Sequence, residues 1–202
     1  MRNIRFICVD FQKEFSTLDG KCYRPRPCVE FIKNTLCPFF REKNLKMAEI
    51  ISDYRQPRPG DRGDSNYPDT EGYISEIPED VKIKPEWVKC MNSPIWTRKN
   101  IGKPDKPSLP YQDPSGFVHW LHTVIGKPSE VDRVIVLGLT LDCCVFCLAQ
   151  ELNWQAYKVQ VLVEAVDTYS GGSEEKELIL NHPPLLNWAK PIFWDELRKT
   201  LI

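Results

Sequence analysis

Histidine, net charge and long apolar runs are all scarce in this chain. The 202 residues include three histidines, and 27 basic and 28 acidic side chains leave a formal net charge of −1. A near-neutral chain gives no general electrostatic reason to expect nucleic acid or an anionic membrane as a partner. No apolar run approaches the roughly 20 residues that a membrane-spanning helix needs, so we expect no membrane partner either.

The N-terminal segment lacks the pattern of an export signal. Its first apolar stretch, residues 4–9, is short and ends at Asp10, so it does not read as a signal peptide. We therefore expect a cytoplasmic protein. The 42% of hydrophobic and 27% of charged residues are typical of a globular chain, and we expect a single domain over residues 1–202.

Cysteine, by contrast, is abundant, with eight residues. A secreted disulfide framework is one interpretation, but the missing export signal and the position of Cys8 inside an apolar run disfavour it. A zinc or iron–sulfur site is another, because Cys143, Cys144 and Cys147 form a CCxxC cluster. The remaining cysteines are scattered and histidines are few, which disfavours this interpretation as well. One thiol could instead be a nucleophile.

Strand-like segments alternate with helical patterns along the chain. Strands are expected where β-branched, aromatic and apolar residues gather, at residues 4–9, 46–52, 93–100, 131–138, 158–166 and 189–194. Helices are expected near residues 28–43, 115–126, 144–156 and 173–181, and Pro38 should bend or break the first of them. This alternation predicts an α/β fold, with a doubly wound, mostly parallel sheet and helices on both faces.

Reactive side chains follow several of the expected strands. They are Asp10, Asp53, Arg55, Arg98, Lys99, Asp142, Cys143 and Cys144. In open α/β sheets, ligands bind outside the carboxyl ends of the strands, which lie at one edge. We therefore expect an acid, a base and a thiol to converge there.

The two neighbouring cysteines stand where a strand gives way to a helical pattern. Unpaired N–H groups and the helix dipole favour a thiolate at such a position, and a nearby ammonium lowers the thiol pKa further. The same N–H groups can hold the oxygen of a tetrahedral intermediate. The junction therefore predicts a nucleophile, ionised near neutral pH, beside an oxyanion site.

Two motifs of this chain resemble those of the isochorismatase-like cysteine hydrolases, which include nicotinamidases and N-carbamoylsarcosine amidases. The run from Gly138 to Val145, GLTLDCCV, is similar to their nucleophile motif, and the alignment implies that Cys144, not Cys143, is the nucleophile. CVDFQKEF, residues 8–15, resembles the strand that carries the general base, which implies this role for Asp10. The resemblance extends over about residues 4–172.

The same resemblance implies a Cys–Asp–Lys triad. Lys99, in IWTRKN, matches the catalytic lysine, with Arg98 and Lys103 as second choices for the cation. It also implies a cis peptide bond before Thr140, which would direct the N–H groups of Thr140 and Cys144 toward an oxyanion.

Two further expectations concern metal and substrate. Metal-dependent members of the family carry Asp-x-His after the second strand, whereas this chain has Asp53, Tyr54 and Arg55, so we expect no metal and no other cofactor. The planar guanidinium of Arg55 could bind a carboxylate or ureido oxygen of the substrate. Phe15 could line the pocket.

The resemblance implies hydrolysis of a carbon–nitrogen bond in a small amide or ureide, through a thioester. The expected partners are that small molecule and further copies of the chain, since family members are usually oligomers. The alternative is a catalytically silent ligand-binding or redox-responsive protein on the same fold. In that case Cys147 would form a reversible bond with Cys143 or Cys144 under peroxide.

Overall fold

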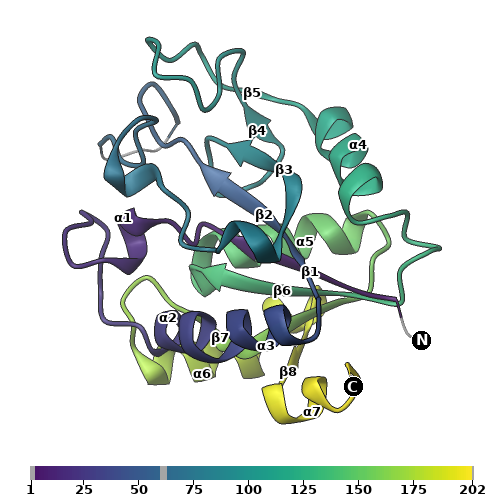
Figure 1. Ribbon diagram of the computed structural model, residues 1–202. Coiled ribbons are helices and arrows are strands. Elements are labelled where there is room, and N and C mark those ends of the chain that lie inside the picture. The colour runs from purple at the N-terminus through teal and green to yellow at the C-terminus, as the bar shows by residue number, and fades with distance from the viewer. Residues whose placement is uncertain (1–2, 60–62, 202) are drawn as a thin grey trace.

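One parallel sheet organises the molecule. The computed structural model describes residues 3–59 and 63–201. Six strands lie in the spatial order β3-β2-β1-β6-β7-β8, and every neighbouring pair is parallel (Figure 1). They are β1 (Ile4–Val9), β2 (Met47–Ser52), β3 (Lys82–Lys89), β6 (Arg133–Leu139), β7 (Val159–Asp167) and β8 (Lys190–Ile192). The chain winds outward in two directions from between β1 and β6, which confirms the doubly wound sheet.

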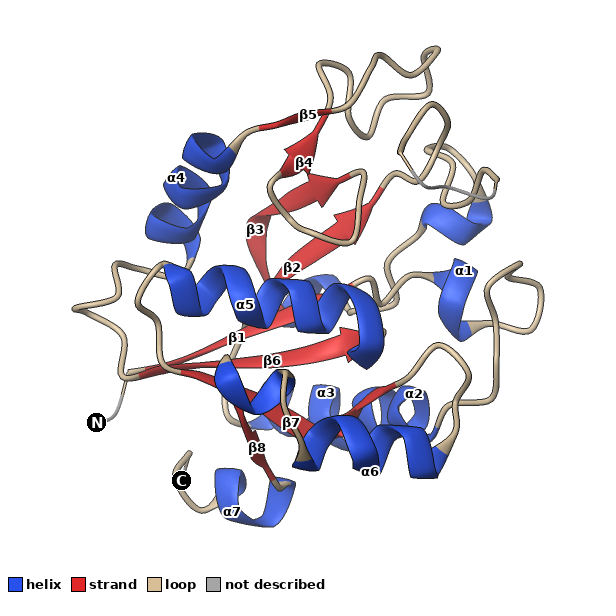
Figure 2. Ribbon diagram, turned by 180° about the vertical axis from the view of Figure 1, so that it is seen from behind, coloured by secondary structure: helices blue, strands red, loops and turns tan. Residues whose placement is uncertain are grey.

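Helices cover both faces of this sheet, as the alternating pattern predicted. The helices α2 (Pro27–Phe31) and α3 (Cys37–Glu42) lie in front of it in Figure 1, and α5 (Phe146–Trp154) lies on the other face, in front in Figure 2. The remaining helices are α1 (Lys13–Ser16), α4 (Pro114–Val124), α6 (Ser173–Asn181) and α7 (Trp194–Arg198). None of the helices in the described residues is long and apolar enough to cross a membrane.

The two central strands are buried along most of their length. Residues 6–9 of β1 and 134–139 of β6 are all buried. Strands covered on both faces bury both sets of side chains, which explains why their sequences are continuously apolar. Near the end of β6, Gly138 has a φ of +106°, and a Cβ there would lie 2.1 Å from the carbonyl oxygen of Val9. Only glycine lets β1 and β6 approach so closely at this point.

Two π-helical turns interrupt the helices. The first, η1 (Ile32–Leu36), joins α2 to α3, so the segment expected as one helix over residues 28–43 is interrupted before Pro38. Proline lacks an N–H and crowds the preceding turn, and the wider π turn accommodates it. The second, η4 (Leu141–Val145), precedes α5 and carries both neighbouring cysteines.

The third strand of the sheet is not the one that the sequence suggested. Within residues 93–100 only β4 (Trp96–Thr97) is a strand, and it pairs antiparallel with β5 (Tyr111–Gln112) in a separate two-stranded sheet. The main sheet is instead extended by β3, which contains Pro85 and several charged residues and therefore resembles a loop. An edge strand tolerates such residues because one side of its backbone has no strand partner.

The cysteines are dispersed through this fold. All eight are free thiols: Cys8, Cys22, Cys28, Cys37, Cys90, Cys143, Cys144 and Cys147. The secreted disulfide framework is thereby removed as an explanation for the high cysteine content.

Candidate active site

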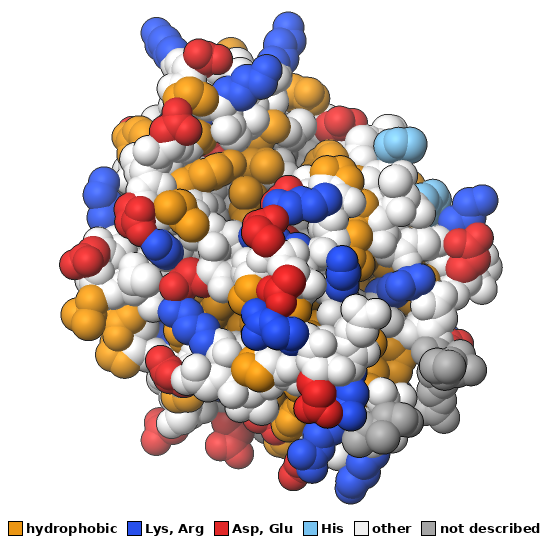
Figure 3. Space-filling model, in the orientation of Figure 1, with side chains coloured by type: hydrophobic (Ala, Val, Ile, Leu, Met, Phe, Trp, Pro, Cys, Tyr) orange, Lys and Arg blue, Asp and Glu red, His pale blue; other side chains and the backbone are white. Residues whose placement is uncertain are grey.

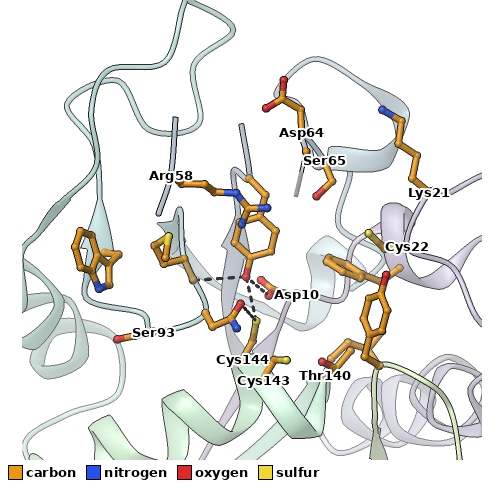
Figure 4. A pocket seen from close by; sticks show the side chains of 18 of the residues that line it. Asp10, Lys21, Cys22, Arg58, Asp64, Ser65, Ser93, Thr140, Cys143 and Cys144 are labelled. Atoms are coloured by element: carbon orange, nitrogen blue, oxygen red, sulfur yellow. Dashed lines mark hydrogen bonds between the residues drawn. The ribbon is translucent and has the colours of Figure 1, made fainter. Parts of the chain in front are cut away.

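A cavity of about 750 Å³ opens at the carboxyl ends of the central strands (Figure 4). Its wall includes Asp10, Thr140, Cys143 and Cys144 from the ends of β1 and β6, and Phe15 from α1. Aromatic and charged side chains complete the wall: Lys21, Tyr54, Arg58, Asp64, Trp96 and Tyr169. The cavity thus lies at the edge of the sheet where the sequence placed the reactive side chains.

Asp10 stands directly after β1, in a backbone conformation with a φ of 49°. Its amide nitrogen donates to the carbonyl oxygen of Ile50 at 2.8 Å, which ties it to the neighbouring β2. The side chain is fully buried. One carboxylate oxygen, Oδ2, accepts hydrogen bonds, whereas Oδ1 has no hydrogen-bond partner among the described residues. A buried carboxylate oxygen without a partner is free to accept a proton.

Cys144 lies in η4, just beyond the end of β6, and only 5% of its surface is exposed. Its Sγ is 3.5 Å from Nζ of Lys89, 3.0 Å from the hydroxyl of Tyr54 and 3.6 Å from Oδ1 of Asn92. Cys143 is half-buried on the same cavity wall. The geometry therefore distinguishes the two neighbouring thiols, because these contacts involve Cys144.

The lysine beside the thiol is Lys89, the last residue of β3. Its Nζ donates to Oδ2 of Asp10 at 2.8 Å, and both side chains are buried. Lys99, by contrast, is exposed. It lies on the loop from β4 to β5, where basic side chains project at the top of Figure 3. This placement corrects the expected lysine from Lys99 to Lys89.

The second choices for the cation are also placed away from the thiol. Arg98 is buried, and its guanidinium donates to the carbonyl oxygens of Arg55 at 2.8 Å and Ser108 at 3.2 Å. Lys103 is exposed on the loop. The misplaced third strand caused this error, since residues 98 and 99 were expected at the sheet edge that Lys89 occupies.

Tyr54, to which the sequence assigned no catalytic role, touches all three of these groups. Its hydroxyl lies 3.2 Å from Oδ2 of Asp10 and 3.0 Å from Sγ of Cys144, and it accepts a hydrogen bond from Nζ of Lys89. It follows β2 directly after Asp53. A signal for it was present, because Tyr54 shares the strand-end position that made Asp53 and Arg55 of interest.

Burial dominates the electrostatics of the thiol. It raises the pKa of Cys144 well above that of an ordinary cysteine, against the opposing effect of the Lys89 ammonium. The direction is opposite to the one expected from the helix start. For Lys89, burial is the largest single influence and lowers the pKa, but the charges and hydrogen bonds of Asp10 and Cys144 together outweigh it and the net shift is upward. The site therefore holds a neutral thiol beside the ion pair of Lys89 and Asp10.

Arg55 does not face the cavity as expected. It is 3% exposed, and its Nε and Nη2 bind the two carboxylate oxygens of Asp53 at 2.8 and 2.7 Å. Its remaining contacts are backbone oxygens of Lys103 and Asp105, so it holds the loop from β4 to β5. This corrects Arg55 from a substrate contact to a buried structural residue. Among the residues that the structure describes, the arginine that lines the cavity is Arg58.

The expected oxyanion residues lie together on the cavity wall. The peptide bond between Leu139 and Thr140 is cis. Thr140 and Cys144 both line the cavity. Asp142, which lies between them, accepts a hydrogen bond from the amide of Tyr169 at 2.9 Å and so links this turn to the segment after β7.

The oxygen, nitrogen and sulfur atoms of the described side chains bear on whether the cavity could hold a metal ion. In residues 3–59 and 63–201, no group of three or more His, Cys, Asp and Glu side chains is arranged to hold one. Both oxygens of Asp53 already bind Arg55, and Oδ2 also accepts from the amide of Gly102 at 3.0 Å.

Comparisons with known proteins were made by sequence and by structure. No protein-family model matches the chain, and no curated protein sequence matches it. An isochorismatase-like hydrolase from Alkaliphilus metalliredigens matches with a TM-score of 0.65 at 17% identity, over 100% of this chain and 99% of its own. The pyrazinamidase of Pyrococcus horikoshii, solved in complex with zinc, gives 0.61 at 19% identity, over 95% and 99%.

An N-carbamoylsarcosine amidase from Thermoplasma acidophilum matches as well, with a TM-score of 0.55 at 16% identity over 95% of each chain. At these identities, structural similarity establishes the arrangement of the helices and strands. The chain has the fold of the isochorismatase-like hydrolases.

Proposed function

We propose that the protein is a cysteine-dependent amidohydrolase that cleaves the carbon–nitrogen bond of a small amide or ureide. The observation that carries this proposal is the cluster of Cys144, Asp10 and Lys89, of which the first two line the cavity. The sulfur is 3.5 Å from the ammonium and the ammonium 2.8 Å from the carboxylate. The pyrazinamidase and the N-carbamoylsarcosine amidase of the same fold support amide hydrolysis as the reaction class.

In the first half of the reaction, Asp10 takes the proton from Sγ of Cys144. The thiolate attacks the carbonyl carbon of the substrate, a C–S bond forms, and the carbonyl oxygen becomes an oxyanion. The N–H groups of Thr140 and Cys144 stabilise that oxyanion. Protonated Asp10 then gives its proton to the leaving nitrogen, the C–N bond breaks, and ammonia or an amine departs from a thioester.

In the second half, water replaces the amine. Asp10 takes a proton from the water, whose oxygen attacks the thioester carbonyl. The C–S bond breaks, the acid product leaves, and Asp10 returns the proton to the sulfur. Lys89 remains an ammonium throughout and stabilises each negative charge that appears on Asp10 or Cys144.

The neutral resting thiol fits this sequence of steps. Burial raises the pKa of Cys144, so the proton leaves only when the carboxylate beside it accepts it. The unpartnered Oδ1 of Asp10 is available for that proton, while Oδ2 keeps its contact with Lys89. The negative charge that Lys89 balances therefore lies on Asp10 before the transfer and on Cys144 after it.

We also propose that this hydrolysis needs no metal. The carboxylate of Asp53, at the position where metal-dependent relatives begin their Asp-x-His motif, is bound at both oxygens by the guanidinium of Arg55. A positive side chain thus occupies the place beside Asp53 that a cation would need. Treatment with a chelator is expected to leave the activity unchanged, and a loss restored by a divalent ion would contradict the proposal.

An ammonia-release screen over small amides and ureides tests the function. We expect at least one substrate, and we expect Cys144→Ala to lower its turnover by more than about 1,000-fold, because the nucleophile is lost. Cys147→Ala is the matched control, since Cys147 lies one helical turn further along, is half-buried and does not line the cavity. Full turnover in Cys144→Ala would refute the proposal.

A ligand-binding protein with an unreactive thiol is the competing function. The upward shift in the pKa of Cys144 is the observation that favours it, because a neutral buried thiol is a poor nucleophile on its own. The same screen separates the two functions. A binding protein would release no ammonia from any amide while still binding one of them.

A further inference from the structure

The hydroxyl of Tyr54 occupies the centre of the reactive cluster. It lies 3.0 Å from Sγ of Cys144 and 3.2 Å from Oδ2 of Asp10, and Nζ of Lys89 donates to it. The phenol is therefore the one side-chain group of the described cluster that contacts the nucleophile, the base and the cation together. Its carbonyl neighbour, the oxygen of Met91, is further away at 3.5 Å.

The number of protons restricts what this hydroxyl can do. Lys89 can only donate, so it takes one lone pair of the phenol oxygen. The phenol has a single proton, and besides the more distant carbonyl oxygen of Met91 two acceptors compete for it: Oδ2 of Asp10 and Sγ of Cys144. While Cys144 is a thiol, its S–H can donate to the phenol oxygen, to Oδ1 of Asn92 or, in the proposed transfer, to Asp10, and the phenol proton goes to Oδ2 of Asp10.

Proton transfer to Asp10 reverses this preference. The thiolate can only accept, and Asp10 has become a neutral acid. The phenol proton then turns from Asp10 to the sulfur, so the hydrogen bond to Oδ2 of Asp10 is exchanged for one to Cys144 while the bond from Lys89 to the phenol oxygen stays in place. Hydrogen bonds to a charged acceptor are roughly twice as strong as neutral ones, so the new bond stabilises the thiolate at the moment it forms.

The surroundings keep Tyr54 in this role. Its side chain is buried, and cations lie on its ring: the guanidinium carbon of Arg58 at 4.1 Å and Nζ of Lys89 at 4.7 Å from the ring centre. Burial, with the charges of Asp10 and Cys144, raises the pKa of the phenol. Tyr54 therefore remains a hydrogen-bond donor and does not compete with Asp10 as a base.

We propose that Tyr54 is a fourth catalytic residue, whose hydroxyl switches its hydrogen bond from Asp10 to Cys144 and stabilises the thiolate. The proposal rests on the proposed function for its place in a reaction. Its physical content, a hydrogen bond to the ionised sulfur, can nevertheless be measured without any substrate.

The test is the rate at which iodoacetamide alkylates Cys144, followed by tandem mass spectrometry that resolves residue 144 from residue 143. The groups that face the sulfur are Asp10, Lys89, Tyr54 and Asn92. Tyr54→Phe removes the hydroxyl and keeps the ring. Tyr157→Phe is the matched control, because Tyr157 is also buried and loses one hydrogen bond, to the carbonyl oxygen of Gly126 at 2.6 Å, outside this cavity.

We expect Tyr54→Phe to slow the alkylation of Cys144 about tenfold at pH 8, the equivalent of one pKa unit, and Tyr157→Phe to leave the rate unchanged. With a substrate from the ammonia-release screen, kcat should fall and KM should stay within about twofold, since a thiolate contact acts after binding. Equal alkylation rates in wild type and Tyr54→Phe would overturn the proposal.

A second variant covers the case in which Tyr54→Phe fails to fold. Incorporation of 3-fluorotyrosine at position 54 keeps the shape and makes the phenol a stronger donor, so we expect faster alkylation of Cys144. An unchanged or slower rate would overturn the proposal. If no substrate is found but alkylation responds as expected, the amidohydrolase function fails while the role of Tyr54 in stabilising the thiolate stands.

Discussion

The central and edge strands contribute to the site in different ways. At the centre, the ends of β1 and β6 supply Asp10, Thr140 and Cys144 from strands whose carboxyl-terminal parts are buried and continuously apolar. At the edge, the end of β3 supplies Lys89, and β3 is a strand of mixed burial that contains a proline. Tyr54 follows β2, which lies between β3 and β1 and is fully buried. The reactive cluster is formed where these two regions meet.

This difference shows which parts of a site a single sequence reveals. A central strand must bury both faces, so its apolar run and its end are visible in the sequence. An edge strand buries fewer side chains and its outer backbone has no partner, so its sequence is nearly that of a loop. The residue after a central strand can therefore be assigned, and the one at the end of an edge strand cannot.

The largest expected effect comes from removing the cation that the edge region supplies. Lys89→Met leaves the carboxylate of Asp10 buried without its ion-pair partner, and we expect turnover to fall about 1,000-fold and the unfolding free energy by about 3 kcal/mol. Lys99→Met changes an exposed side chain and should leave both unchanged. Turnover of purified variants and urea unfolding measure these effects. A loss of turnover confined to Lys99→Met would mean that Lys99 is the catalytic cation, as the sequence suggested.

A smaller effect is expected for the pair that holds the loop beside the edge strands. Arg55→Gln leaves both oxygens of the buried Asp53 without their guanidinium, which should lower the unfolding free energy by about 3 kcal/mol. The KM should change little, because Arg55 does not line the cavity. Chemical denaturation and steady-state kinetics provide the two measurements. A large rise in KM with unchanged stability would support a substrate contact instead.

The smallest expected effect is the pH dependence of the thiol. Burial raises the pKa of Cys144, so the sulfur is neutral at pH 7 and its ionised fraction grows as the pH rises. Alkylation of Cys144 should therefore accelerate about tenfold for each pH unit between 7 and 9. Site-resolved mass spectrometry measures this slope. An alkylation rate that no longer changes with pH above 7 would mean that the helix start and Lys89 outweigh burial, as the sequence alone suggested.

Much of the fold could be predicted from the sequence. The strands at residues 4–9, 46–52, 131–138 and 158–166 correspond to β1, β2, β6 and β7, because each is apolar enough to show its buried faces. The error at residues 93–100 has a physical cause. Trp96 and its neighbours are aromatic and apolar because they form a short ribbon beside the cavity.

The residues of the candidate site also fall into a group that the sequence showed and a group that it did not. Asp10, Cys144 and Thr140 were expected on the wall of one cavity, and the structure brings them together there. Lys89 could not be assigned, since its position depends on the pairing of β3 with β2, a contact between segments about 35 residues apart that no local pattern specifies. Tyr54 follows a strand that the sequence did show, but no local pattern indicates that its hydroxyl would reach Cys144. Arg55 was misjudged because the sequence did not show that its neighbour Asp53 would be buried.

The irregular pairing of β3 with β2 restricts where residues can be inserted into or deleted from this chain. Ala48 faces Ile83 and Ile50 faces Trp87, so residues 84–86 stand opposite Glu49 alone. Side chains alternate between the two faces of a strand, so one residue more or fewer between this irregularity and Lys89 would turn the ammonium away from the thiol. We therefore expect related sequences that keep this chemistry to gain or lose an even number of residues between this irregularity and Lys89.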